Sequence, residues 1–441
     1  MTVCELRITS LGGLGDGIAT HHVLPVFVEK AAVGDVLSVR LTQQTREHAR
    51  AEILEILSPG PQRVAPPCPH FSRCGGCSLQ QLSENAYRTH KRKVLADALA
   101  HAGFGEVQAE IVFLPMASRR RVELKWDGQH FAYYASRSRA LVPIAQCLIL
   151  EPALQALLPP LAEALRSWPA QAGIKTIRLT AADSGTEMLI EHSETATPPT
   201  AHSDLAERAR PLGIDRIILN GKTILEHAPI TMRLGDVDVP LPPGAFLQAT
   251  REGAQLLTQA VVRAILPPPL GGRSGGGQTC SDSANHAPLP ASPLKGEEFN
   301  IADLFCGLGT YSFALARQAR VHAVELDAGM SQALKRQAQA QGLSELTSET
   351  RDLFTAPLRA AELARFDAVV LNPPRPGAKA QCEEIAKSSV KKAVMVSCSP
   401  ASFARDAKIL KNAGFSLLSA QGIDQFVMSP HLEIVAAFTR V

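Results

Sequence analysis

The stretch "DLFCGLGT", residues 303–310, decides the fold of the C-terminal part of this chain. A strand pattern, "NIADLFCG", ends in a glycine-rich turn, and a helical pattern, "TYSFALARQA", follows directly. Gly307 and Gly309 let the backbone approach a ligand closely, while the first turn of the helix offers free N–H groups. The stretch therefore predicts a strand, a ligand-binding turn and a helix in that order.

Strand and helix patterns alternate from residue 299 to the end of the chain. Segments such as "RVHAVELD", "FDAVVLNPP", "KKAVMVSCS" and "EIVAAFTRV" are separated by helical patterns such as "ASFARDAKILKNAG". Continuous apolar strands joined by crossover helices are typical of a doubly wound, mostly parallel sheet that is covered on both faces. We therefore expect a Rossmann-like α/β domain over residues 241–441.

Two acidic residues follow strand patterns of this domain. Glu325 ends "VELD", where it would accept hydrogen bonds from ribose hydroxyls, and Asp352 in "TRDLF" would meet an adenine edge. A helix cap would explain either carboxylate alone, but the ordered set favours a cofactor site. Because no GxGxxG phosphate-binding signature is present, S-adenosylmethionine fits this site better than NAD.

Two further motifs indicate the reaction. "VSCSP" places Cys398 at the end of a strand, and "SPHLE" brings His431 and Glu433 before the last strand. Such a cysteine is usually an inert core residue, but the N-terminus of the helix at 401–413 would lower its pKa. A thiolate that adds to C6 of uracil makes C5 nucleophilic enough to attack a sulfonium methyl group, and a carboxylate then removes the C5 proton. Cys398 and Glu433 therefore suit methylation of a pyrimidine carbon.

The preceding part of the chain predicts two further domains and an insertion. Residues 1–57 contain about five short strand patterns separated by Gly and Asp turns, which suits an OB-like β-barrel. Residues 58–240 hold a cysteine cluster and a mixture of strand and helix patterns, and we expect an α+β domain there. Pro, Gly and Ser dominate residues 267–298, which we interpret as a disordered insertion.

The composition is that of a globular protein that carries basic runs. The 441 residues are 45% hydrophobic and 20% charged, with a net charge of +3. Lys and Arg gather in "THKRK" (89–93), "SRRRVELK" (118–125) and "SRSR" (136–139), which either bind nucleic acid or form solvated faces. No apolar run reaches the roughly 20 residues of a membrane span, and "MTVCELRITS" does not resemble a signal peptide. We expect a cytoplasmic protein.

Three cysteines lie close together in "CPHFSRCGGCSLQQL", residues 68–82. Cys68, Cys74 and Cys77 are ligand types for zinc or for an iron–sulfur cluster, but a tetrahedral site or a [4Fe–4S] cluster needs four. Cys147 in "LVPIAQCLIL" is the obvious fourth ligand. Zinc is the generic interpretation of a C-x2-C pair, and unmetallated core thiols are the remaining alternative.

Several motifs together resemble the bacterial RNA 5-methyluridine (uracil-C5) methyltransferase family. They are "DLFCGLGT", "NPPRPG", "VSCSPASFARD" and "DQFVMSPHLE", and "LGGLGDGIA" with "VFVE" resembles the family's RNA-binding TRAM domain. The resemblance covers nearly the whole chain except 267–298. It implies a methyltransferase domain, an N-terminal TRAM-like barrel and a central iron–sulfur domain. Its ribosomal-RNA branch has the same cysteine arrangement, which favours a [4Fe–4S] cluster over zinc.

The resemblance also implies roles for individual residues. Cys398 would be the nucleophile and Glu433 the base. The pocket for S-adenosylmethionine would be lined by Gln248, Phe305, Gly307, Gly309, Thr310, Glu325, Asp352 and Asn372. The family usually has aspartate where this chain has Asn372, so the affinity or the uracil contact at that position is open.

We therefore expect S-adenosylmethionine-dependent C5-methylation of a uridine in RNA, most simply 23S rRNA, by a monomer without a protein partner. One alternative target is the T-loop uridine of tRNA, although that branch generally lacks both the barrel and the cysteines. Another alternative is an amino-group methyltransferase. The stretch "LNPP" resembles the (D/N)PP-aromatic motif of those enzymes, but here Arg375 stands where the aromatic residue would be. A role in RNA binding without catalysis is the third.

Overall fold

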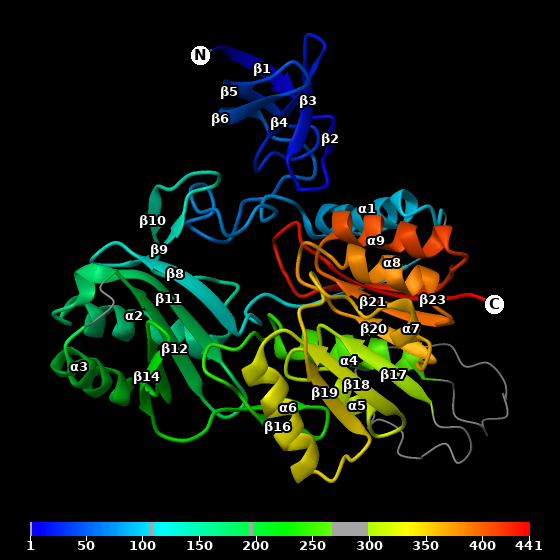
Figure 1. Cartoon of the computed structure of the whole chain (residues 1–441). Helices are drawn as coiled ribbons and strands as arrows, with labels where there is room; N and C mark the ends of the chain where they lie inside the picture. Colours follow the sequence, from blue (N-terminus) through cyan, green and yellow to red (C-terminus); the bar gives the residue numbers. More distant parts are fainter. Residues whose placement is uncertain (1, 106, 108, 194–196, 267–298) are drawn as a thin grey trace, which may run out of the picture.

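A computed structural model describes residues 2–105, 107, 109–193, 197–266 and 299–441. Three large β-sheets and one two-stranded sheet organise these residues (Figure 1). The N-terminal and central sheets each pack on one apolar core, and the C-terminal sheet lies between two. The predicted insertion at 267–298 lies outside the described residues. Among the described helices, none combines the length and the apolar character that crossing a membrane requires.

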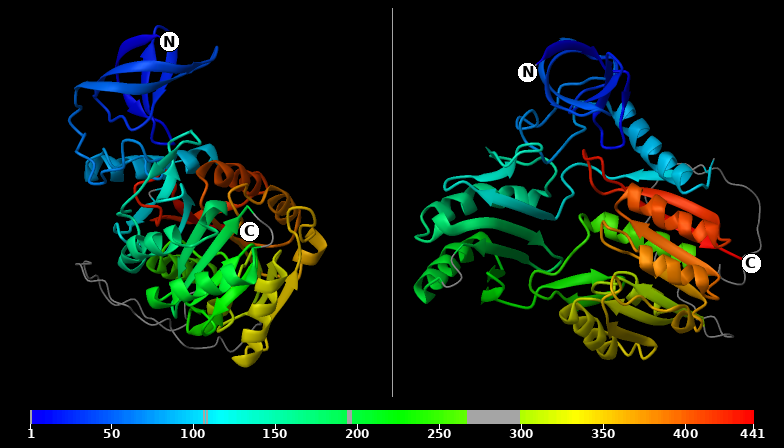
Figure 2. Two further views of the ribbon diagram at one scale, coloured as in Figure 1. Left: turned by 90° about the vertical axis from the view of Figure 1, so that its left-hand side faces the viewer. Right: turned by 45° about the horizontal axis from the view of Figure 1, so that its top comes forward.

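The N-terminal sheet has the strand order β1-β5-β6-β4-β3-β2. Its strands are β1 (Val3–Arg7), β2 (Ser10–Leu11), β3 (Gly17–His21), β4 (Leu24–Val28), β5 (Val36–Gln44) and β6 (Ala49–Ser58). Alternate residues such as Leu37 and Val39 point inward and are fully buried, as a period of two requires. Figure 2 shows that the sheet curls into a rounded unit above the rest of the molecule.

The central sheet has the strand order β10-β9-β8-β11-β12-β13-β14. These strands are β8 (Arg121–Trp126), β9 (Phe131–Tyr134), β10 (Leu141–Pro143), β11 (Ile174–Ala181), β12 (Thr186–His192), β13 (Arg216–Leu219) and β14 (Lys222–Glu226). The helices α2 (Pro152–Arg166) and α3 (Pro199–Ala209) share its apolar core. A hairpin of β15 (Thr231–Leu234) and β16 (Val237–Pro240) leads from this sheet to the last one.

The C-terminal sheet has the strand order β19-β18-β17-β20-β21-β23-β22-β7. Its strands are β17 (Asn300–Leu304), β18 (Arg320–Glu325), β19 (Leu346–Thr350), β20 (Ala368–Leu371), β21 (Lys392–Ser397), β22 (Ser416–Asp424), β23 (Glu433–Thr439) and β7 (Glu110–Phe113). The first five strands of this order are parallel, whereas β23 runs antiparallel to both of its neighbours. This is the predicted Rossmann-like, mostly parallel sheet.

Helices cover both faces of this sheet because its strands are apolar on both sides. They are α1 (Glu84–His101), α4 (Arg251–Ile265), α5 (Ser312–Leu315), α6 (Ala328–Ala340), α7 (Ala360–Leu363), α8 (Lys379–Lys387) and α9 (Pro400–Asn412). Ile301 packs in the core that includes α4 and α6, and its neighbour Ala302 packs in the core that includes α1, α8 and α9. Successive side chains of β17 therefore enter opposite layers.

One segment crosses the domain boundaries expected from the sequence. Helix α1 packs against α9 (Figure 1). Strand β7 pairs with β22 in parallel at the edge of the C-terminal sheet. Both elements lie within residues 58–240, which we expected to form the central domain. Instead, β7 extends the C-terminal sheet, and α1 packs in one of its apolar cores.

Candidate active site

A cavity of about 560 Å³ opens at the carboxyl ends of the parallel strands. It brings together nine of the ten residues predicted for the cofactor and the reaction. They are Gln248, Phe305, Gly307, Thr310, Glu325, Asp352, Asn372, Cys398 and Glu433. Gly309 does not line the cavity. Its φ is +89°, and a Cβ there would lie 2.8 Å from Leu334 Cδ1, so this glycine lets the turn pack against α6.

The turn after β17 fixes the carboxylate of Glu325 in this cavity. Phe305 and Gly307 both have positive φ, 60° and 58°, which turns the backbone sharply after the strand. The Gly307 N–H donates to Glu325 Oε2 (2.9 Å), and the Asp327 N–H donates to Oε1 (3.0 Å). Each oxygen retains a lone pair for a ligand hydroxyl. The geometry is therefore suitable for the predicted ribose contact.

Asp352 shapes the next loop of the cavity. Its carboxylate accepts hydrogen bonds from the Phe354 N–H and from Thr355 Oγ1, each 2.9 Å long, and these bonds lower its pKa. The ring of Phe354 lies 5.4 Å from that of Phe305, between centroids, at an angle of 58°. Asp352 thus has a structural role as a turn cap, and beside it two aromatic rings present an apolar surface to the cavity.

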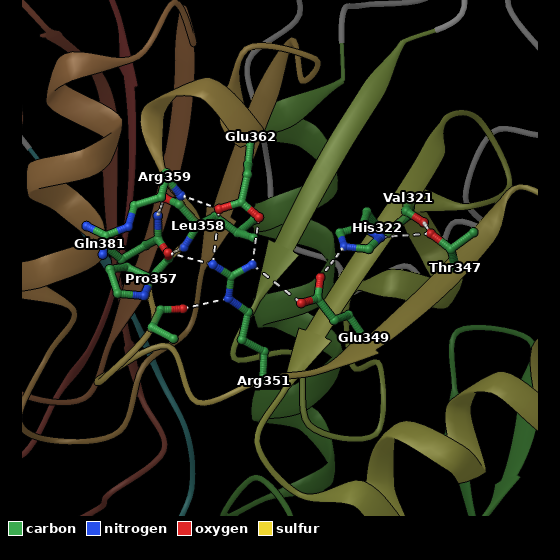
Figure 3. Close-up of polar contacts among 11 residues, drawn as sticks. Val321, His322, Thr347, Glu349, Arg351, Pro357, Leu358, Arg359, Glu362 and Gln381 are labelled. Atoms are coloured by element: carbon green, nitrogen blue, oxygen red, sulfur yellow. Dashed lines mark hydrogen bonds and ion pairs between the residues drawn. The ribbon is translucent and has the colours of Figure 1, made fainter.

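Arg351, the residue before Asp352, connects this loop to the segment 356–362 (Figure 3). Its guanidinium pairs with Glu362 and donates to the carbonyl oxygens of Ala356 and Pro357. A hydrogen bond from Arg351 lowers the pKa of Glu362 to about 2. This bidentate pair keeps the segment beside Asp352 in one conformation.

The antiparallel pairing of β21 and β23 brings Cys398 and Glu433 together. Ser397 is the register partner of Ile434, so the same register extended by one position sets Cys398 opposite Glu433. Cys398 directly follows β21 and Glu433 is the first residue of the neighbouring strand β23, and both side chains line the cavity. The predicted nucleophile and base therefore share one site.

The electrostatics of this pair differ from the sequence-based expectation. Burial raises the pKa of Glu433 from 4.5 to about 7, against a hydrogen bond from Gln425 and the charge of Arg375. Burial and the charge of Glu433 also raise the pKa of Cys398. We expected the N-terminus of the helix after Cys398 to lower that pKa. Desolvation outweighs any such effect, so the thiol is predominantly protonated at neutral pH in the free protein.

Arg375 and Gln425 complete the site, and the sequence did not reveal either of them. Arg375 lowers the pKa of Cys398 through its charge and a hydrogen bond, and its Nη2 lies 3.1 Å from His431 Nε2. Gln425 Nε2 donates both to Gln248 Oε1 (2.7 Å) and to a carboxylate oxygen of Glu433 (3.0 Å). Both residues lie in motifs that carry the family resemblance, Arg375 in "NPPRPG" and Gln425 in "DQFVMSPHLE", but neither was assigned a role there.

Basic side chains surround the mouth of the cavity. Arg119, Arg121 and Arg178 line it together with Phe246, which is 60% exposed and lies under the Arg121 guanidinium, 5.2 Å from ring centroid to Cζ. Arg120 also lines it but is only 1% exposed, and its Nε donates to the Gln248 carbonyl. The run at 118–125 thus supplies both surface cations and a structural arginine.

The run at 89–93 is not a simple basic surface. Lys91 has a fully buried side chain that pairs with Asp424, and His90 is 4% exposed. Of the cations in this run, Arg92 and Lys93 remain exposed. The interpretation of the whole run as a possible RNA-binding surface was therefore wrong for Lys91.

The four predicted metal ligands line a second cavity, of about 230 Å³. Cys68, Cys74, Cys77 and Cys147 all contribute to it, and burial raises the pKa of Cys77 to about 12. Within the described residues, no group of three or more His, Cys, Asp or Glu is arranged to hold a single metal ion. The four thiols therefore share a cavity, but their present spacing does not form a mononuclear site.

The fold and the site together define the class of this protein. A doubly wound sheet with a cavity at the carboxyl ends of its strands, lined by the ordered acidic residues, is that of an S-adenosylmethionine-dependent methyltransferase. The sequence model of the family described as "Methyltransferase domain" matches residues 301–391, which include β17 to β20.

Two relatives place the chain more closely. A Caulobacter vibrioides protein named as an RNA methyltransferase is 36% identical over 448 residues, which cover 99% of this chain and 100% of that protein. The 23S rRNA (uracil(1939)-C(5))-methyltransferase RlmD of Shewanella halifaxensis is 30% identical to this chain. The matched region covers 98% of this chain and 95% of that protein. The chain therefore belongs to the RNA uracil-C5 methyltransferase family and is an S-adenosylmethionine-dependent enzyme.

A solved structure shares the fold over the whole chain. It is the tRNA (uracil-54, C5)-methyltransferase of Pyrococcus abyssi in complex with S-adenosyl-L-homocysteine, with a TM-score of 0.72 and 19% identity over 99% of this chain and 100% of that one. At this identity the comparison shows a common fold and no more.

Proposed function

We propose that this enzyme transfers the methyl group of S-adenosylmethionine to C5 of a uridine in 23S rRNA. The observation that carries the proposal is the strand register that sets Cys398 opposite Glu433 in the cavity of the cofactor residues. A nucleophile and a base that line one cavity from neighbouring register positions can act on adjacent atoms of a pyrimidine ring.

The reaction would proceed in two halves. The Cys398 thiolate adds to C6 of the uracil, and the electron pair that moves to C5 attacks the methyl carbon of the sulfonium, so that S-adenosylhomocysteine leaves. Glu433 then takes the proton from C5, the C5–C6 double bond re-forms and the C6–S bond breaks. The thiolate is regenerated, and Glu433 passes its proton to solvent.

The cofactor would lie along the turn after β17. Glu325 would accept hydrogen bonds from the ribose hydroxyls, and the adenine would pack against Phe305 and Phe354. Gln248, Thr310 and Asn372 would line the remainder. Asn372 keeps the shape of the family's aspartate without its charge, so it would contact the uracil or the cofactor as a neutral hydrogen-bonding group.

The target uridine would have to leave its RNA helix to reach Cys398. A flipped base requires an aromatic or apolar surface and backbone contacts at the mouth of the cavity. Phe246 offers the aromatic surface. The backbone contacts would come from Arg119, Arg121 and Arg178. The N-terminal unit, residues 1–57, would act as a TRAM-like barrel that binds the RNA outside the cavity.

The four cysteines would hold a [4Fe–4S] cluster. Such a cluster needs four thiolates, each bound to a different iron, and therefore needs them farther apart than a single ion does. Four thiols around a shared cavity of about 230 Å³ fit this requirement better than the requirement of zinc. The cluster would supply a structural brace, because the proposed methyl transfer includes no electron transfer. Iron and sulfide analysis of anaerobically purified protein, with Cys77→Ser as the comparison, tests this assignment.

Covalent trapping tests the reaction. Wild-type enzyme incubated with methyl donor and a 5-fluorouridine 23S rRNA fragment should form an adduct that survives denaturing electrophoresis, since fluorine at C5 cannot be removed as a proton. Cys398→Ala should form none, whereas Cys4→Ala, a change at a half-buried cysteine of the N-terminal sheet, should behave as wild type. An adduct with Cys398→Ala, or none with wild type on any RNA, would refute the mechanism and leave amino-group methylation as the alternative.

Target choice is tested separately with tritiated S-adenosylmethionine. The enzyme should label a 23S rRNA fragment that contains the family's target uridine and should leave tRNA transcripts unlabelled. Labelling of tRNA alone would assign the tRNA T-loop uridine as the substrate instead.

A further inference from the structure

The loop 425–432 joins β22 to β23 and leads directly into Glu433. It begins with Gln425, whose side-chain amide holds both Gln248 and Glu433. Near its end lies His431, whose Nε2 is 3.1 Å from Arg375 Nη2. The position of Glu433 in the cavity therefore depends on how this loop is held.

Helix α1, more than 300 residues earlier in the sequence, holds this loop through two buried side chains. Lys91 Nζ donates to Asp424 Oδ1 (2.7 Å) and to the carbonyl oxygen of His431. The Tyr87 hydroxyl donates to Asp424 Oδ2 and accepts from the Met428 N–H (3.1 Å). Tyr87 and Lys91 are one helical turn apart, so they contact the start, the tip and the end of the loop from one face of α1.

The tip of the loop is held in a conformation that needs such support. Met428 has a φ of 61°, which is uncommon for a residue other than glycine and persists only where its surroundings impose it. The N–H groups of Ser78 and Leu79 donate to the Met428 carbonyl (3.0 and 3.2 Å). Both backbone groups of Met428 are therefore bound by a segment outside the loop.

The buried ion pair is poorly explained by stability. Lys91 and Asp424 both have 0% exposed side chains. Replacing such a pair with well-packed apolar residues is often neutral or stabilising, because desolvation opposes the attraction. Directional hydrogen bonds to a carbonyl and a carboxylate, in contrast, fix geometry in a way that apolar packing does not.

We propose that Tyr87, Lys91 and Asp424 are positioning residues for Glu433, which fix the loop 425–432 so that Gln425 holds the carboxylate at the site of proton removal. This inference rests on the proposed function. It assigns to α1 a role in the second half of the reaction, whereas addition of Cys398 and methyl transfer depend on β21 and on the turn after β17.

The two halves can be measured separately. Adduct formation with 5-fluorouridine RNA requires the thiolate and the cofactor but no removal of a C5 proton. Turnover on uridine RNA requires both halves. A loss of positioning at Glu433 should therefore slow turnover, leave the fluorouridine adduct rate unchanged, and let a methylated covalent complex accumulate on uridine RNA. A general loss of folding would reduce both rates together.

Tyr87→Phe is the variant of choice, because it removes one hydroxyl group and keeps the ring. Lys91→Met, in contrast, would leave the buried carboxylate of Asp424 without its cation and risks unfolding the protein. We expect about tenfold slower turnover, as for loss of one or two hydrogen bonds, with the fluorouridine adduct rate within about twofold of wild type. Asn85→Ala, at an exposed, uncharged position of α1 outside the basic run, is the matched control and should leave both rates unchanged.

The outcomes separate this inference from the proposed function. If Tyr87→Phe turns over like wild type, or loses both rates equally while its unfolding transition matches wild type, the positioning role is wrong. If wild type itself forms no fluorouridine adduct, the proposed function fails first. Accumulation of the methylated complex with Tyr87→Phe and its absence with Asn85→Ala would support the inference.

Discussion

Replacing the proposed base should stabilise the folded protein at alkaline pH. Burial raises the pKa of Glu433 from 4.5 to about 7 in the folded state. A carboxyl with a raised folded pKa contributes stability that is fully present below the unfolded pKa and is lost as pH rises through the folded pKa. At pH 8 the ionised carboxylate is therefore a cost to the folded state, and Glu433→Gln removes the charge while it keeps the shape.

The size of the effect follows from the shift. The difference of 7 − 4.5, about 2.5 units, corresponds to about 3 kcal/mol at 1.36 kcal/mol per unit. The amide oxygen can still accept from Gln425, and the amide N–H groups face the cavity, where water can satisfy them. We therefore expect Glu433→Gln to gain about 1–3 kcal/mol at pH 8 and less than about 1 kcal/mol at pH 5.

Urea unfolding followed by circular dichroism at both pH values measures this difference. Glu110→Gln, at an exposed position of the edge strand β7 in the same sheet, is the matched control and should change the unfolding free energy by less than about 0.5 kcal/mol at either pH. The reasoning is refuted if Glu433→Gln is no more stable than wild type at pH 8, or if its gain does not shrink at pH 5. Glu433→Gln should also be inactive in turnover on uridine RNA and should accumulate the methylated covalent complex.

Three further changes test other parts of the site. Arg375→Gln should raise the pKa of Cys398, because the charge and the hydrogen bond of Arg375 lower that pKa. The pH midpoint of alkylation of Cys398 by iodoacetamide, followed by mass spectrometry of the peptide that contains it, should therefore move upward. Arg351→Met should weaken S-adenosylmethionine binding by about tenfold in calorimetry. The change removes the bidentate pair with Glu362 that holds the segment beside Asp352, which lines the proposed cofactor cavity. Gly309→Ala should lower the unfolding free energy by about 1–3 kcal/mol in a urea titration, because a Cβ there is both strained and 2.8 Å from a side chain of α6.

The sequence could predict the parts of the site that depend on local order. Glu325 and Asp352 follow strands of a parallel sheet, and the carboxyl ends of such strands necessarily meet at one edge. Period and apolar content were sufficient to recognise β17, β18 and β21 and hence to place Cys398. The short helix α5 was predicted as a longer one, because the apolar pattern after Thr310 continues beyond its last helical residue.

The remaining features depend on contacts between distant segments. The run that contains Lys91 has the composition of a surface, and only the packing of α1 against the C-terminal sheet buries it. Nothing in the spacing of Gln425 indicates that its amide joins Gln248 to Glu433. The pairing of β7 with β22 likewise connects residues more than 300 positions apart. Such contacts are set by tertiary structure, for which single-sequence patterns carry no signal.

The raised pKa values of Cys398 and Glu433 give the cation that lines the same cavity, Arg375, a role in the reaction. The proposed cycle needs a thiolate in its first half and a carboxylate in its second, yet burial disfavours both anions and the charge of Glu433 disfavours the thiolate further. Arg375 lowers the pKa of both groups. It can therefore support each anion in turn without a second negative charge having to accumulate. The thiolate passes its charge to the uracil ring, and methyl transfer from the sulfonium cation neutralises that charge before Glu433 must act, so one arginine is sufficient for both halves of the reaction.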